Sequence, residues 1–220
     1  MKRWLFGHGL LLVNLALFLL FLIGMALTGW QVANEELLEH GAPAETFGQF
    51  LASGDFSEAV FENWESEFLQ MGAYVVLTVF LFQKGSAESK PLDEPAPQDD
   101  DPRRHAKKAD APWPVRHGGF VLVLYENSLL ILFALLFTAS FVGHAVSGAA
   151  AYSEEQGLHG MPGVSPVEYL GTSQFWFESF QNWQSEFMVV AVLVFAAVWL
   201  RQRGSAESKP VAAPHAETSG

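Results

Sequence analysis

Two glutamate–histidine pairs are spaced as metal ligands would be. Glu36 lies four residues before His40, and Glu155 lies four residues before His159, so each pair shares one face of a helical turn. Together they would form a two-histidine, two-glutamate set suited to zinc, manganese or iron. Each histidine is also followed by glycine, which favours a helix C-cap, where histidine interacts well with the helix dipole. We take capping as the simpler interpretation and expect no bound cofactor.

A second polar set lies in the best-matched block of an internal duplication. Residues 61–68 (Phe-x-Asn-Trp-x-Ser-Glu-Phe) recur at 180–187 and place Asn63 with Glu67, and Asn182 with Glu186, at helical i, i+4 spacing. A carboxylate at the mouth of an apolar segment is costly unless it has a partner. The set is therefore either an outside-facing site for a cation or small ligand, or a structural cluster across the repeats, which we favour. Glu65, which aligns with Gln184, is expected to face water.

Little else in the chain indicates chemistry. Met25 aligns with His144, and a methionine–histidine pair can bind haem, although such a histidine more often hydrogen-bonds a neighbouring helix. The absence of cysteine excludes disulfides, thiolate metal sites and iron–sulfur clusters, and the net charge of −12 argues against nucleic acid as a partner. No phosphate loop, nucleophile elbow or nucleotide motif is present, so we do not expect an enzyme.

The elements that carry these residues are predicted to be transmembrane helices. Half of the residues are hydrophobic and only 16% are charged, and residues 9–29 and 127–148 are long apolar segments that can each cross a bilayer. Two shorter runs become long enough if they begin near Trp64 and Trp183, which gives further spans at 64–83 and 183–201. The fold class predicted is an all-α integral membrane protein with four transmembrane helices.

The chain is an ungapped duplication. Residues 5–91 align with 124–210 at an offset of 119, and residues 85–91 are identical to 204–210. We divide it into repeat 1 (1–91), a disordered cytoplasmic linker (92–119), repeat 2 (120–210) and a disordered tail (211–220). Two spans in each repeat make the repeats parallel. Small residues predict close packing of spans one and three through Gly24, Thr28, Ala139, Gly143 and Ser147.

Charge predicts the orientation. All 12 lysines and arginines lie at the termini or between residues 84 and 116, and neither 30–62 nor 149–182 contains one. The positive-inside rule then places both termini in the cytoplasm of a multi-pass inner-membrane protein. Interface anchors are expected at Trp30, Trp64, Trp183 and Trp199. Capping boxes at Thr46–Gln49 and Ser165–Glu168 predict short helices in the outside loops, with a bend near residues 53–54 before the next long helix.

These repeated motifs resemble an uncharacterised family of bacterial integral membrane proteins, known as a domain of unknown function. The resemblance covers nearly the whole chain outside the linker and tail, and it implies no activity, cofactor or catalytic residue. We therefore favour a structural or interaction protein of the cell envelope, whose partners are the lipid bilayer and an unidentified protein. The alternatives are a small transporter or channel, and a metal- or redox-binding membrane protein.

Overall fold

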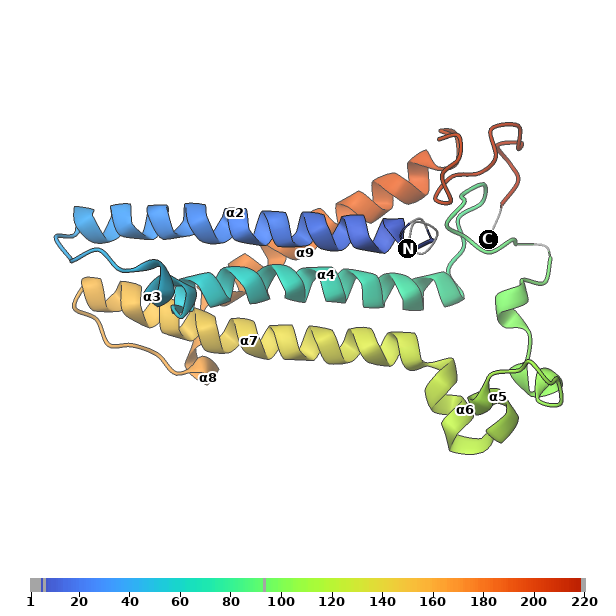
Figure 1. The fold of residues 1–220 in the computed structure, drawn as a ribbon, viewed down its shortest axis with the longest axis horizontal. Coiled ribbons are helices and arrows are strands. Elements are labelled where there is room, and N and C mark those ends of the chain that lie inside the picture. Colours follow the sequence, from blue (N-terminus) through green and yellow to red (C-terminus); the bar gives the residue numbers. More distant parts are fainter. Residues whose placement is uncertain (1–4, 6, 93, 219–220) are drawn as a thin grey trace. The chain divides into compact units, whose positions relative to one another are not determined.

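The computed structural model describes residues 5, 7–92 and 94–218, and these residues form helices and loops without any strand (Figure 1). The helices are α2 (Gly9–Glu39), α3 (Phe47–Leu51), α4 (Gly54–Phe80), the 3₁₀ turns η1 (Pro97–Asp99) and η2 (Pro102–His105), α5 (Trp113–His117), α6 (Gly119–Glu126), α7 (Ser128–Leu158), α8 (Pro166–Tyr169) and α9 (Ser173–Ala196).

Helices α2 and α7 are long and apolar enough to cross a membrane. Each has 31 residues, or about 46 Å at a rise of about 1.5 Å per residue, against a hydrocarbon thickness of about 30 Å. Only 6% and 17% of their most apolar windows are buried, less than is typical of the core helices of a soluble protein. Their exposed apolar side chains need a non-aqueous environment, which gives a first indication of a membrane location.

The chain divides into two compact units, residues 1–61 with 142–175, and residues 62–141 with 176–220. We refer to these as unit 1 and unit 2 and describe each by itself. The division passes through α4, α7 and α9, so each of these helices contributes to both units.

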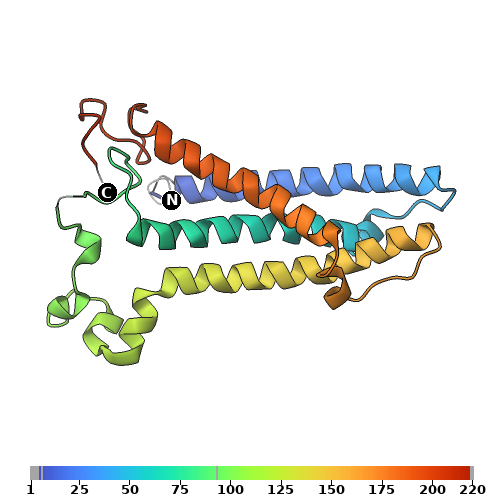
Figure 2. The ribbon, with the colours of Figure 1, turned by 180° about the vertical axis from the view of Figure 1, so that it is seen from behind.

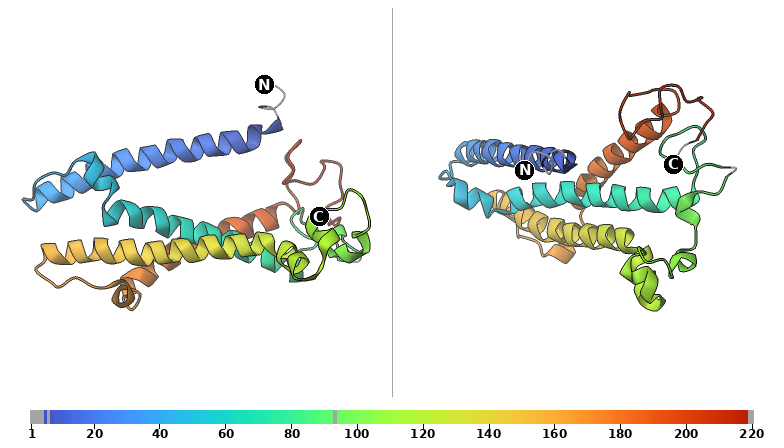
Figure 3. Two further views of the ribbon diagram at one scale, coloured as in Figure 1. Left: turned by 60° about the horizontal axis from the view of Figure 1, so that its bottom comes forward. Right: turned by 45° about the vertical axis from the view of Figure 1, so that its right-hand side comes forward.

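Within unit 1 the chain turns back after each long helix and returns to a short one. These returns follow α2 and α7 and can be traced from several sides (Figures 2 and 3). Gly41 and Gly160 have φ angles of 73° and 70°, a left-handed conformation that suits glycine at a helix C-terminus. The short helices α3 and α8 then begin with complete capping boxes at Thr46 and Ser165, as the sequence predicts.

The same polar bridge holds both returns in place. In the first copy the Glu45 N–H donates to Asn34 Oδ1 at 2.7 Å, and Asn34 Nδ2 donates to the Glu45 carbonyl at 3.2 Å. In the second copy the Val164 N–H donates to Ser153 Oγ at 2.9 Å, and that hydroxyl contacts the Val164 carbonyl at 3.2 Å. Both residue pairs are offset by 119 positions, so the two copies fold alike locally although their side chains differ.

The first part of α4 packs closely against α7 in unit 1. A Cβ at Gly54 would lie 2.5 Å from the Ala151 nitrogen, and one at Gly143 would lie 2.6 Å from the Phe61 ring. The Cβ position of Gly24 has no neighbour within 4 Å. The small-residue face predicted for span three thus packs on α4 around Gly143, and the predicted contact of span one at Gly24 is not present in unit 1.

Unit 2 contains the segment predicted as a disordered linker. The structure describes η1, η2 and α5 there, and Ala111, Val115 and Leu122 form a small apolar cluster with Ala106. Asp101 caps η2 by accepting from the Arg103 N–H at 3.0 Å, which favours these short turns locally. The disorder predicted for the linker and tail stays a prediction.

Candidate functional site

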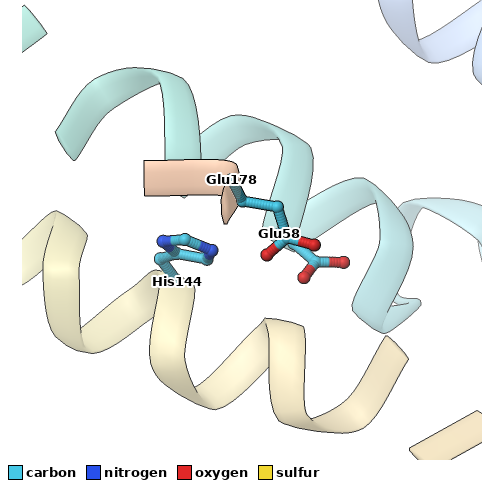
Figure 4. Close-up of side chains that lie close together, drawn as sticks. All are labelled: Glu58, His144 and Glu178. Atoms are coloured by element: carbon cyan, nitrogen blue, oxygen red, sulfur yellow. The ribbon is translucent and has the colours of Figure 1, made fainter. Parts of the chain in front are cut away.

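A histidine and a carboxylate meet inside unit 1. His144 on α7 has no exposed surface, and a ring nitrogen lies within 4.8 Å of a carboxylate oxygen of Glu58 on α4 (Figure 4). The Tyr169 hydroxyl donates to Glu58 Oε1 at 2.9 Å, and Tyr169 is also fully buried. Histidine, glutamate and tyrosine from three helices therefore form one polar cluster, with Glu58 half-buried, which we call the Glu58–His144 centre.

Packing fixes the positions of these side chains. The Phe175 ring stacks on the His144 imidazole with 4.6 Å between centroids, and Tyr169 approaches it edge-on at 6.4 Å. Gly148 on α7 leaves the space, because a Cβ there would lie 2.5 Å from Glu58 Oε1 and 2.4 Å from a Tyr169 ring carbon. Glycine at position 148 is thus required for the carboxylate and the phenol to reach the helix.

Helix α9 carries a further acidic residue, Glu178, close in sequence to Phe175. Glu178, the third side chain labelled in Figure 4, follows Phe175 by three residues in α9. Residues with that spacing share one face of a helix. Imidazole with carboxylates is a ligand type used for zinc, manganese and iron.

This centre could be predicted only in part from the sequence. His144 is noted as a possible haem ligand, whereas Glu58 is not singled out. The reason is that Glu58 aligns with Phe177, so a search for residues alike in both copies passes over it. Its spacing from Gly54 and Phe61 on one face of α4 is the signal that would have drawn attention to it.

The predicted cluster of Asn63, Glu67, Asn182 and Glu186 lies in unit 2. The hydrogen-bond acceptors there are not the glutamates that the sequence predicts. Asn182 Nδ2 donates to Glu62, and Trp183 Nε1 donates to Glu65 at 3.1 Å. Glu65 is fully buried, so the expectation that it faces water is wrong. Asn63 and Glu67 are exposed and Glu186 is half-buried.

The histidines that end α2 and α7 approach each other within unit 1. The His40 and His159 rings lie edge-on with 6.4 Å between centroids, and both side chains are exposed. His40 is the C-cap residue of α2, and its Nδ1 lies 2.9 Å from the Glu36 carbonyl oxygen. Within the part of the chain that the structure describes, the Glu36 and Glu155 carboxylates do not join these two rings in a three-residue ligand group.

The predicted tryptophan anchors occupy different environments. Trp30 Nε1 donates to the Glu45 carbonyl at 2.9 Å and so ties α2 to the loop before α3. Trp199 is half exposed beside Phe195, with 4.8 Å between ring centroids, and Trp64 is 36% exposed. The Trp183 indole N–H donates its hydrogen bond to Glu65. Anchoring by Trp30, Trp64, Trp183 and Trp199 at a membrane interface stays a prediction.

A domain of unknown function (DUF6766) matches the chain over residues 1–220. No curated protein and no solved structure matches the chain.

Proposed function

We propose that this chain, which belongs to the DUF6766 family along its whole length, is a multi-pass membrane protein that binds a divalent metal ion. The ligands are Glu58 and His144. The observation that carries the proposal is the complete burial of His144 beside the Glu58 carboxylate.

The membrane arrangement that we propose has four spans, formed by α2, α4, α7 and α9, in two parallel repeats. Both termini and the linker lie in the cytoplasm and the protein resides in an inner membrane. The proposal is supported by the placement of all 12 lysines and arginines outside segments 30–62 and 149–182. It places the Glu58–His144 centre toward the outer side of the membrane.

The surroundings of the centre suit a metal ion. A neutral imidazole and a carboxylate supply one nitrogen and up to two oxygen ligands. Tyr169 would orient Glu58, as hydrogen-bond partners commonly do for metal-binding carboxylates. A metal would also offset the cost of holding a carboxylate in a poorly solvated region.

Elemental analysis of the detergent-purified protein tests the proposal. We expect about one zinc, manganese or iron per chain, lost in His144→Ala and Glu58→Gln and weakened about 10- to 100-fold in Tyr169→Phe. His159→Ala is the matched control, because His159 is an exposed histidine directly after α7. This substitution should leave the metal content unchanged. Metal that persists in His144→Ala, or wild-type protein that takes up none of the three metals, would refute the proposal.

A structural or interaction role in the envelope is the second candidate function. The observation that favours it is the ordering of both outside loops by capping boxes, in segments that carry carboxylates and no lysine or arginine. A transporter or channel is less favoured, because Asn14 and Thr78, two isolated polar side chains of the proposed spans, form hydrogen bonds inside their own helices. Asn14 Nδ2 donates to the Leu10 carbonyl at 2.8 Å, and Thr78 Oγ1 donates to the Tyr74 carbonyl at 3.0 Å. We propose no enzymatic activity.

A further inference from the structure

A groove lies in unit 1 between α2 and the segment formed by α3 and the start of α4. It encloses about 400 Å³, within the range of small-molecule sites. Its wall is mostly apolar, and two carboxylates interrupt it. The lining residues are Met25, Thr28, Gly29, Val32, Ala33, Glu36, Phe50, Asp55, Phe56 and Ala59.

This groove corresponds, through the internal duplication, to the region of the Glu58–His144 centre. Met25 aligns with His144, Phe50 with Tyr169, and Phe56 with Phe175. The aromatic pairs keep the same arrangement: Phe50 and Phe56 are edge-to-face at 5.5 Å, and Tyr169 and Phe175 are edge-to-face at 5.6 Å. The first copy therefore retains the aromatic framework, but methionine replaces the imidazole, and an open groove replaces the filled polar cluster.

The electrostatics of the groove favour a cation. Burial, followed by the charges of Glu154, Glu36 and Glu155, raises the pKa of Asp55 above its usual value. Burial and the charges of Glu154 and Asp55 likewise raise the pKa of Glu45 nearby. Segments 30–62 and 149–182 contain no lysine or arginine to balance these carboxylates. A positive group in the groove would reduce this mutual repulsion.

We propose that the groove binds an amphipathic organic monocation, an ammonium group attached to an aliphatic chain. Asp55 and Glu36 face the charge, and the rings of Phe50 and Phe56 offer the aromatic surface that quaternary ammonium groups favour. Met25 and Val32 contact the chain. A zwitterionic lipid fits less well, because its phosphate would meet these carboxylates with no basic side chain of either segment to pair with it.

Binding of decyltrimethylammonium to the purified protein in a neutral maltoside detergent tests the proposal. The matched ligand is its uncharged tert-butyl analogue of the same chain length. Calorimetry should show the cation binding at least about tenfold more tightly than the neutral analogue. Asp55→Asn should reduce affinity for the cation about tenfold, and Glu36→Gln should weaken it in the same direction. Glu39→Gln is the control, since Glu39 is an exposed carboxylate of the same helix that does not line the groove.

A cavity-filling variant makes the test independent of the charged residues. Ala33→Phe should abolish binding while the protein keeps its thermal stability. Equal affinity for the cation and its neutral analogue, or unchanged binding in Ala33→Phe, would overturn the proposal. So would displacement of the cation by phosphatidylethanolamine, which would make the groove a lipid site. Protein stripped of metal by a chelator should still bind the cation, which separates this result from the fate of the metal proposal.

Discussion

Loss of the buried Glu65 carboxylate in unit 2 should destabilise the protein. Glu65 is fully buried, and its Oε1 accepts a hydrogen bond from Trp183 Nε1 at 3.1 Å. Glu67, two residues further along the chain, is exposed. Glu65→Ala leaves that buried donor without this acceptor, so we expect a loss of about 1–3 kcal/mol of stability. Glu67→Ala should be close to neutral. Thermal unfolding of the two variants in detergent measures the difference, and a larger effect at Glu67 would contradict the structure.

At the scale of single residues, the hydrogen bonds in unit 2 use other glutamates than the repeated ones. Asn182 and Trp183 lie in the block that the duplication marks, and both donate to glutamates outside the predicted set. The acceptors are Glu62 and Glu65, which align with glutamines. A search for residues that are identical in both copies therefore favours Glu67 over them. Burial depends on which face of α4 meets α9, and internal repetition does not encode that face.

The contact between α4 and α7 depends on Gly54. An added Cβ would lie 2.5 Å from the Ala151 nitrogen and 3.0 Å from the Ser147 carbonyl oxygen, and backbone atoms cannot move aside as a side chain can. Gly54→Ala should therefore destabilise the protein by about 1–3 kcal/mol. Gly24→Ala is the matched control, because its Cβ would meet nothing within 4 Å and alanine is the better helix former. Thermal melts that show Gly24→Ala to be the more damaging change would restore the predicted packing of spans one and three.

At the scale of elements, local signals carried most of the predictive value. The capping boxes at Thr46 and Ser165 and the bend at residues 53–54 are confirmed, because short-range hydrogen bonds and glycine determine them. Helix α2 continues to Glu39, ten residues past the predicted end of its span at residue 29, since a helix does not stop where the hydrocarbon does. Gly143 of α7 packs against Phe61 of α4, whereas Gly24 has no such neighbour, because a face of small residues fits any helix that approaches closely.

At the scale of the whole molecule, segments that align at an offset of 119 residues have similar local frameworks that carry different side chains. The hydrogen-bonded bridges at Asn34 and Ser153 correspond to each other, and so do the paired aromatic rings. In contrast, His144 aligns with Met25. A sequence comparison of the copies shows what they share, which is mainly the scaffold. The residues that differ between copies are the ones from which we propose separate ligands.

The number of spans decides how this framework sits in a membrane, and three single-cysteine variants distinguish the possibilities. The chain has no cysteine, and Ala44, Met161 and Ala109 are exposed. Four spans predict that Ala44→Cys and Met161→Cys react with an impermeant thiol reagent in intact spheroplasts, and that Ala109→Cys reacts only after permeabilisation. If α2 and α7 alone crossed, Ala44 and Ala109 would share one side and Met161 would lie on the other. Labelling of Ala109→Cys alone would keep four spans but reverse the orientation, against the positive-inside rule. The labelling pattern therefore tests α4 and α9 as spans separately from the direction of insertion.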